Sequence, residues 1–130
     1  MSIPDTATIR AFLEPRHQAI AGHAAAFARD EIATLGVAAD DDAARVQARE
    51  VLRRLGADGW MSHLVPAALG GGEHAPDLRA CCLVREALAA ASPLADAVFA
   101  LQCLASMPWC WRPTTRRGAP GCRACCAARR

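Results

Sequence analysis

The segment that most constrains the fold runs from Leu55 to Gly72 and reads LGADGWMSHLVPAALGGG. A Leu-Gly pair of the kind that ends a helix precedes a Gly-Trp corner, a short apolar run, a proline and three glycines. These glycines and the proline interrupt regular structure, because glycine favours turns and proline lacks a backbone donor. The segment therefore predicts the end of one helix and a loop that crosses to the next.

Capping and stop signals predict two helices before this loop. Pro15 lies near the first turn of the first helix, and Gly36 ends that helix. Aspartates at positions 40–42 supply a cap and the negative charge that favours the start of the second helix. This second helix ends at Gly56.

Two further helices begin at turns that contain proline. Pro76 and Asp77 open the third, and Ser92 caps the fourth with Pro93 at its first helical position. Residues in all four helices recur with the helical period. The positions that recur at this spacing are Ile20, Ala24, Phe27, Glu31 or Ile32, and Leu35; Ala44, Ala48, Val51 or Leu52, and Leu55, which form an apolar stripe; Leu78, Cys81 or Cys82, Arg85 and Leu88; and Leu94, Val98, Leu101, and Leu104 or Ala105. The predicted fold is all-α, an up-down helical bundle.

Length and composition restrict the class of protein. The 130 residues suffice for one domain with a modest core, and an apolar content of 53% argues against general disorder. No apolar run reaches the roughly 18 residues of a membrane span. The N-terminus lacks the basic and apolar segments of a secretory signal. We therefore expect a cytoplasmic protein with reduced thiols and no membrane partner.

The composition changes abruptly at Pro108. Residues 1–108 carry 9 Arg and 13 acidic residues, a net charge of −4. Residues 109–130 carry 6 Arg and no acid, together with four of the seven Cys and two of the three Trp. This second segment has no helical period and no Leu, Ile or Val. We expect two parts, a helical domain over 1–108 and a disordered Arg/Cys-rich tail over 109–130.

Four motifs occur in a fixed order over about 90 residues. Leu55 to Trp60 fits Leu-x-x-x-Gly-(Leu/Trp). Val65 to Gly71 fits Val-Pro-Glu-x-x-Gly-Gly, with Ala67 in place of the acid and Gly72 as a third glycine after it. Val84 to Ala89 fits (Val/Ile)-x-Glu-Glu-(Leu/Ala)-(Ala/Gly), with one of the two acids replaced. Leu101 to Pro108 resembles a helix that ends in a small residue and proline. In this order the motifs resemble the N-terminal helical domain of the acyl-CoA dehydrogenases, which are FAD-dependent flavoproteins.

The resemblance implies an oxidoreductase reaction. In the family, a carboxylate takes the α proton of an acyl thioester and the flavin accepts the β hydride. The catalytic base and most flavin contacts come from later domains, so no catalytic residue is expected in this chain. FAD and homo-oligomers belong to the full-length family, and we expect this chain alone to be inactive and to bind no flavin. The fourth helix would form one wall of the acyl pocket, with Asp96, Ala97, Ala100 and Leu104 as candidates.

The sequence gives less support to a phosphate-binding, metal or nucleophile site. The glycines at 70–72 lack the Lys and Ser/Thr of a phosphate-binding loop, and turn geometry explains them better. His17 and His23 are six residues apart and would not share a helix face. No motif of paired His with Glu, or of Cys with His, appears, so no metal or nucleophile site is predicted. The cysteines at 81, 82 and 103 fit small apolar helix positions.

The tail allows three interpretations. A one-base loss near the Pro108 codon would explain it, because GC-rich codons regrouped by one base permit Gln-Arg and Trp-Leu-Pro at the family's spacing. Thiolates of Cys110, Cys122, Cys125 and Cys126 are a possible zinc set, although only one Cys-x-x-Cys is present. The Arg and Trp residues could instead bind nucleic acid weakly. The shifted frame is the preferred interpretation.

The sequence as a whole allows three hypotheses about function. The leading hypothesis is an N-terminal fragment of an acyl-CoA dehydrogenase. The alternative is a small helical protein-interaction module without catalysis. A nucleic-acid binder with a basic tail is the third and least favoured reading.

Overall fold

The computed structural model describes residues 6–67, 71–72 and 75–111, with side chains up to Ser106. All elements of this part are helical. In chain order they are η1 (Arg10–Phe12), α1 (Pro15–Phe27), η2 (Ala28–Ile32), η3 (Ala33–Leu35), α2 (Asp41–Ala57), η4 (Trp60–Leu64), α3 (Leu78–Ala91) and α4 (Pro93–Trp111). The prediction of an all-α chain is confirmed.

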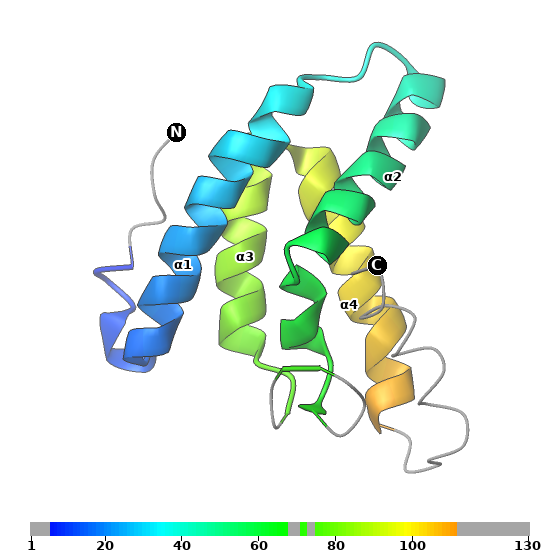
Figure 1. Cartoon of the computed structure of the whole chain (residues 1–130). Helices are drawn as coiled ribbons and strands as arrows, with labels where there is room; N and C mark the ends of the chain where they lie inside the picture. Colours follow the sequence, from blue (N-terminus) through cyan, green and yellow to red (C-terminus); the bar gives the residue numbers. More distant parts are fainter. Residues whose placement is uncertain (1–5, 68–70, 73–74, 112–130) are drawn as a thin grey trace.

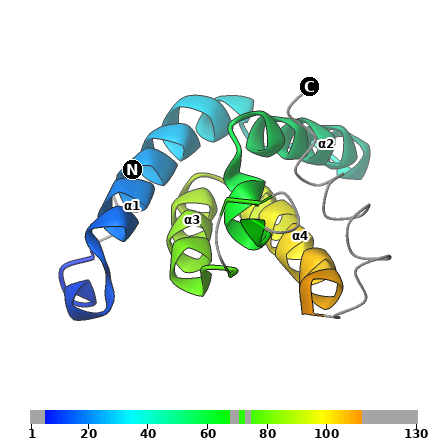
Figure 2. The ribbon, with the colours of Figure 1, turned by 60° about the horizontal axis from the view of Figure 1, so that its bottom comes forward.

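The four long helices run alternately up and down (Figure 1). Helix α1 packs on α3, α3 on α4, and α4 on α2. Viewed from below, α1 and α2 lie above α3 and α4, with η4 enclosed between the layers (Figure 2). The architecture is therefore the expected up-down bundle, and η4 supplies residues to its centre.

The predicted capping residues begin the helices. The Asp40 carboxylate accepts a hydrogen bond from the Ala43 N–H at 2.8 Å, and Pro93 occupies the first position of α4 after Ser92. Asp77 caps α3 by accepting from the N–H groups of Arg79 and Ala80. Each cap satisfies donors that the first turn of a helix leaves without an intrahelical partner.

Glycines in the left-handed region end two of the helical segments. Gly36 (φ 68°) follows η3, the 3-10 turn that continues α1 through the π-helical segment η2. Gly59 (φ 84°) precedes Trp60 and turns the chain from α2 into η4. Residues with a side chain rarely adopt this conformation. A glycine at each of these two positions therefore indicates a turn at the end of a helix from the sequence alone.

The core lies between the layers and draws on every long helix. Its largest fully buried members include Phe99 of α4, Ile32 of η2, Leu55 of α2 and Leu88 of α3. Trp60 from η4 contributes the only buried indole in the described core. Many other members are alanines, so the helices approach closely but bury little area per residue.

Candidate functional site

The four predicted pocket residues lie together on one side of α4. Asp96 and Ala97 are in its first turns, with Ala100 and Leu104 farther along. Successive residues of an α-helix are about 100° apart around its axis. At that spacing, the four positions fall within about 100° of the helix circumference. The structure therefore brings the predicted residues onto a single sector, which we call the outer sector of α4.

The opposite side of α4 carries the core contacts. Ala95 and Phe99 are fully buried. By contrast, Leu101 is 62% exposed and Leu104 is 67% exposed. The recurrence of Leu101 and Leu104 at helical spacing therefore does not mark the buried side of the helix. Helix α4 is apolar nearly all round, so helical periodicity does not identify which of its sides packs against α3.

In α3, too, recurrence at helical spacing does not identify the buried side. Leu78 is 57% exposed and Arg85 is also exposed, whereas Leu83, Val84 and Ala87 are buried. Helix α3 contacts α1, α4 and η4. Because several neighbours surround it, its buried face is wider than a single stripe at helical spacing.

An ion pair joins the outer sector of α4 to α3. The Arg85 guanidinium donates two hydrogen bonds to the Asp96 carboxylate, at 2.8 and 3.0 Å. The side chain of Arg85 is about half exposed and that of Asp96 is mostly covered. The carboxylate beside it raises the pKa of Arg85. This two-pronged geometry holds Asp96 in place and puts a polar boundary at the start of an otherwise apolar sector.

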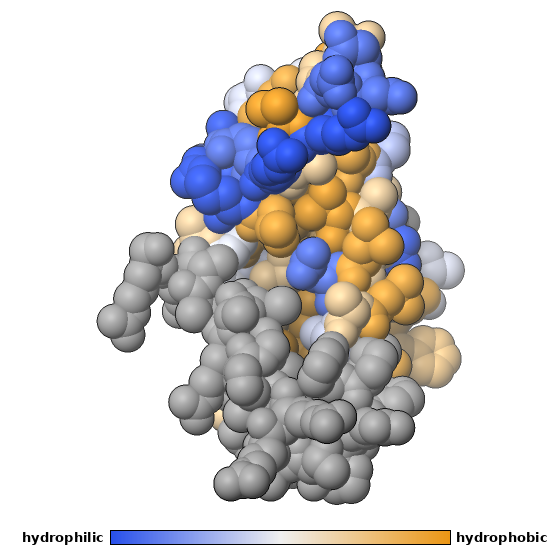
Figure 3. Space-filling model, turned by 90° about the vertical axis from the view of Figure 1, so that its right-hand side faces the viewer, coloured by the Kyte–Doolittle hydropathy of each residue, from blue (hydrophilic) through white to orange (hydrophobic). Residues whose placement is uncertain are grey.

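The surface near α4 is apolar over a continuous area. Figure 3 shows apolar surface on the side of the molecule where α2 and α4 lie, next to a strongly polar rim. Leu52 and Val46 of α2 are also exposed, in addition to Leu101 and Leu104. Exposed apolar areas of this kind mark surfaces that bind another molecule or domain.

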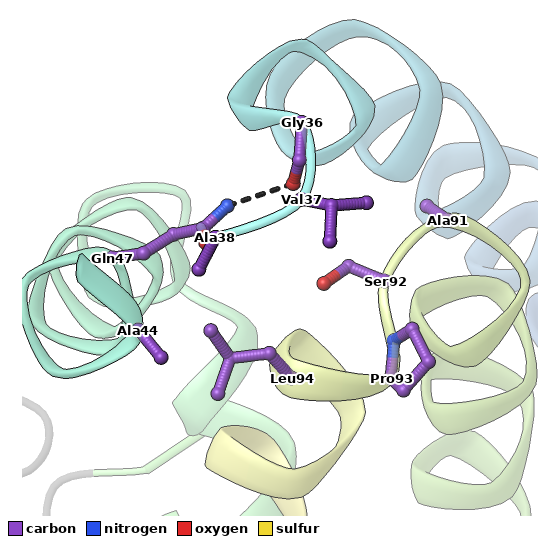
Figure 4. A pocket seen from close by; sticks show the side chains of 9 residues that line it. All are labelled: Gly36, Val37, Ala38, Ala44, Gln47, Ala91, Ser92, Pro93 and Leu94. Carbon is purple, nitrogen blue, oxygen red and sulfur yellow. Dashed lines mark hydrogen bonds between the residues drawn. The ribbon is translucent and has the colours of Figure 1, made fainter. Parts of the chain in front are cut away.

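A separate pocket of about 280 Å³ lies at the end of the bundle where the α1–α2 and α3–α4 connections meet (Figure 4). The Gln47 amide donates to the carbonyl oxygens of Leu35 and Gly36, and so fixes the loop that borders it. Its lining residues are Gly36, Val37, Ala38, Ala44, Gln47, Ala91, Ser92, Pro93 and Leu94. None of the four predicted pocket residues lines it, so this pocket is distinct from the outer sector of α4.

The Gly-Trp corner has a structural role. Trp60 is buried, and its ring lies 4.6 Å from the ring of His23 and 5.6 Å from that of Phe27, centroid to centroid. Its indole N–H is buried without a hydrogen-bond partner among the described residues. The interpretation of this corner as a helix stop with an anchoring aromatic is confirmed.

The glycine-rich loop is explained by close backbone contact. A Cβ at Gly71 would overlap the carbonyl group of Val65, whereas one at Gly72 would meet only Ser62 at ordinary contact distance. The Gly71 N–H also donates to the carbonyl of Pro66. This glycine thus allows two backbone segments to touch, which supports turn geometry over phosphate binding.

Sequence reasoning missed a buried polar cluster. His17 of α1 is fully buried, its Nδ1 accepts from the Glu14 N–H at 2.9 Å, and its Nε2 lies 2.9 Å from the Asp77 carboxylate. Because Nδ1 accepts, Nε2 must carry the proton and donate to Asp77. Arg16 also contacts this carboxylate, at 2.8 Å. The available signal was the histidine at the third helical position after Glu14, where it completes a capping box.

Several absences hold only for the described part of the chain. It contains no group of three or more His, Cys, Asp or Glu side chains placed to hold a metal ion. None of its helices is long and apolar enough to cross a membrane. The cysteines and arginines of residues 112–130, on which the zinc and nucleic-acid interpretations depend, lie outside the described residues.

A family comparison agrees with this architecture. The family model described as the acyl-CoA dehydrogenase N-terminal domain matches residues 14–112. The chain belongs to this family. The match begins one residue before α1 and ends one residue after α4, so it covers the whole four-helix bundle. No curated protein matches the chain.

Proposed function

We propose that this chain is the N-terminal helical domain of an FAD-dependent acyl-CoA dehydrogenase, with the outer sector of α4 as one wall of the acyl pocket. The observation that carries the proposal is the apolar sector of α4, exposed in a bundle that the family match covers from end to end. The proposed substrate is an acyl thioester. The proposed reaction of the assembled enzyme is α,β-dehydrogenation, with FAD as hydride acceptor.

The residues of the sector suit a hydrocarbon chain. Ala97 and Ala100 leave room beside the helix, and Leu104 projects an apolar side chain that is 67% exposed. Transferring such surface from water to contact with an acyl chain is favourable, by about 25 cal/mol per Å². The Arg85–Asp96 pair would then bound the apolar wall at one end.

Two hollows among the described residues do not fit FAD. One is the pocket between the helix connections, about 280 Å³, and the other lies between η1 and α3 and has a volume of about 370 Å³; both are at the low end of ligand pockets. Their linings are mainly apolar and offer no cluster of donors for a pyrophosphate. We therefore propose that the flavin is held by other domains and that this chain alone is inactive.

A domain exchange tests this proposal. Residues 14–112 would replace the N-terminal helical domain of an acyl-CoA dehydrogenase of known activity. We expect the chimera to retain flavin and to oxidise acyl-CoA substrates. L104W would then lower kcat/KM for long acyl chains by about tenfold, because a bulky ring shortens the pocket, whereas V46W on α2 would leave the chain-length preference unchanged. A chimera that binds flavin but shows the same preference with and without L104W would refute the assignment of α4.

A second candidate is an interaction module without catalysis. The same exposed leucines, Leu101 and Leu104, favour it, because an apolar helix face also suits a protein partner. The chimera separates the two ideas. Activity in the chimera supports the enzyme domain, and a chimera that folds but neither holds flavin nor turns over substrate supports the module.

A further inference from the structure

A second apolar surface lies on the side of the bundle away from α2 and α4. A groove of about 370 Å³ runs between the short helix η1 and α3. Its exposed apolar residues include Phe12, which is 72% exposed, Leu78, which is 57% exposed, and Ile9. Figure 2 shows η1 on the opposite side of the molecule from α2 and α4. The proposed function, which uses the outer sector of α4, leaves this groove unexplained.

An arginine of α3 gives the groove a fixed shape. The Arg79 guanidinium donates to the Phe12 carbonyl oxygen at 3.0 Å and to the Glu14 carboxylate. These bonds join α3 to the last residue of η1 and to the N-cap of α1, so η1 is held against α3. About half of the Arg79 side chain remains exposed. Because the groove is already formed in the single chain, binding there requires little reordering.

Opposite charges lie at the two ends of the exposed side of α3. Arg79 is in the first turn of the helix, and Glu86 follows seven residues later; both line the groove. At about 1.5 Å and 100° per residue, the two positions are about 10 Å apart along the helix axis and within about 20° around it. Glu86 is exposed, and its carboxylate has no ion pair or hydrogen bond with the described residues. The surface thus has a basic end and an acidic end.

The size of the exposed side chains also changes along α3. The large apolar groups of Phe12 and Leu78 lie at the end where the helix begins. Its last turn exposes the small residues Ala89 and Ala90. Cys82, near the middle, is also small and exposed. A large, basic end and a small, acidic end together form a surface that is complementary to its own reverse.

We propose that this surface binds a second copy of the chain, with the two α3 helices antiparallel. A two-fold axis close to Cys82 would place each Arg79 opposite Glu86 of the other copy. It would also place Phe12 and Leu78 of each copy over the small end of the other. Such an interface is isologous, because each contact occurs twice. A parallel pair in register would instead oppose like charges, so the charges select the antiparallel arrangement.

The extent of the surface predicts a weak dimer. One helix face and a single 3-10 turn contribute fewer than the roughly 20–30 residues that each side of a stable interface provides. We therefore expect a dissociation constant in the micromolar range. Analytical ultracentrifugation of the full chain under reducing conditions should show a monomer–dimer equilibrium. This expectation rests on η1 and α3 and does not depend on the proposed role of α4.

An exchange of charges tests the pairing. E86R opposes two positive charges across the dimer, and R79E opposes two negative charges. Each variant alone should therefore dimerise about tenfold more weakly than the parent chain, whereas an equimolar mixture of the two should recover the parent affinity. R49E, at an exposed position of α2, is the matched control and should leave the affinity unchanged. Circular dichroism shows whether each variant keeps its helices.

A second measurement does not depend on R79E, which also removes the bonds that hold η1. In the full chain with serine at every other cysteine, Cys82 lies close to the proposed axis, so a short bismaleimide should join two copies. F12A should lower the yield about tenfold, because it removes an apolar side chain from the interface without touching the core. V37A, at a residue that is 99% exposed in the α1–α2 connection, should not lower it.

Three results would overturn the proposal. The first is a chain that sediments as a monomer at every concentration up to the millimolar range and is not joined through Cys82. The second is a pair of folded variants, E86R and R79E, that do not associate when they are mixed. The third is a dimer that E86R leaves unchanged and L104E abolishes, which would assign the contact to the apolar surface near α4 instead.

Discussion

At the scale of single residues, His17 determines how α1 meets α3. Its ring is fully buried between the Glu14 N–H and the Asp77 carboxylate. Replacing His17 with alanine removes both hydrogen bonds and leaves a buried carboxylate with fewer donors. We expect H17A to lower the free energy of unfolding by about 1–3 kcal/mol. Urea denaturation measures the change, and Q18A, at an exposed position on the same helix, should lie within about 0.5 kcal/mol of the parent chain. Equal effects of the two substitutions would contradict this role.

Asp77 illustrates how neighbours outweigh burial. Burial raises its pKa, but the hydrogen bonds from His17 and the Ala80 N–H, with the positive charge of Arg16, outweigh that effect and hold the pKa below its usual value. The ionised carboxylate thus stabilises the fold above pH 3.8. This contribution disappears as the pH falls through the lower pKa of the folded state.

Glu50 should produce a measurable acid dependence. Hydrogen bonds from Arg53 and Arg54 lower its pKa from 4.5 to about 2. Because the folded-state pKa is depressed, the stabilisation is complete above pH 4.5 and is lost as the pH falls toward 2. E50Q should therefore flatten the decline of unfolding free energy across this range in a pH series of urea titrations, whereas E86Q, at an exposed position on α3, should leave it steep. A series in which E50Q and the parent chain decline in parallel would contradict the prediction.

At the scale of elements, the loop before α3 depends on one glycine. A Cβ at Gly71 would overlap the Val65 carbonyl, but one at Gly72 would have room. G71A should cost about 1–3 kcal/mol, because the backbone must move apart as it does in an overpacked core. G72A is the matched control and should change little. Thermal denaturation of both variants checks the contrast, and similar melting temperatures would mean that the loop adapts freely.

Truncating a side chain on the inner side of α4 should lower the free energy of unfolding more than truncating one on the outer sector. Phe99 is fully buried, whereas Leu104 is 67% exposed. F99A should cost about 3–5 kcal/mol, since it removes a buried ring and leaves a cavity. L104A should change the free energy of unfolding by no more than about 0.5 kcal/mol relative to the parent chain. Urea unfolding of the two variants distinguishes the inner side from the outer sector, and a large loss with L104A would contradict the assignment.

The elements themselves were predictable because their signals are local. Asp40, Ser92 and Pro93 identify helix starts, and Gly36 identifies a helix end from the sequence alone. The buried sides of α3 and α4 were less predictable. Which leucines are buried depends on how many helices surround each one, and that is a property of the tertiary arrangement. The hydrogen bond between His17 and Asp77 joins residues that are 60 positions apart, so no short sequence motif predicts it.

The candidate site shows the same limit. The family resemblance selected Asp96, Ala97, Ala100 and Leu104, and the structure places all four on one sector. The ion pair between Arg85 and Asp96 was not predicted, because the two residues lie on different helices.

At the scale of the whole molecule, the composition change near Pro108 is the remaining feature to explain. Helix α4 continues past Pro108 to Trp111, and the family match ends at residue 112. Family resemblance thus stops close to the point where acidic and branched apolar residues disappear from the sequence. We propose that a one-base loss near the Pro108 codon changed the reading frame, and that the residues beyond it were not selected as protein.

The DNA sequence decides this last prediction. Translation in the neighbouring frame from the Pro108 codon should give Gln-Arg and then Trp-Leu-Pro, followed by a β-domain and a second helical domain of the dehydrogenase type. Correcting the frame should yield a protein that retains FAD and dehydrogenates acyl thioesters, and L104W in that protein should shift its chain-length preference as in the chimera. A stop codon soon after Pro108 in that frame would exclude the shift. The bundle would then be a module whose exposed α4 leucines must find their partner in another chain.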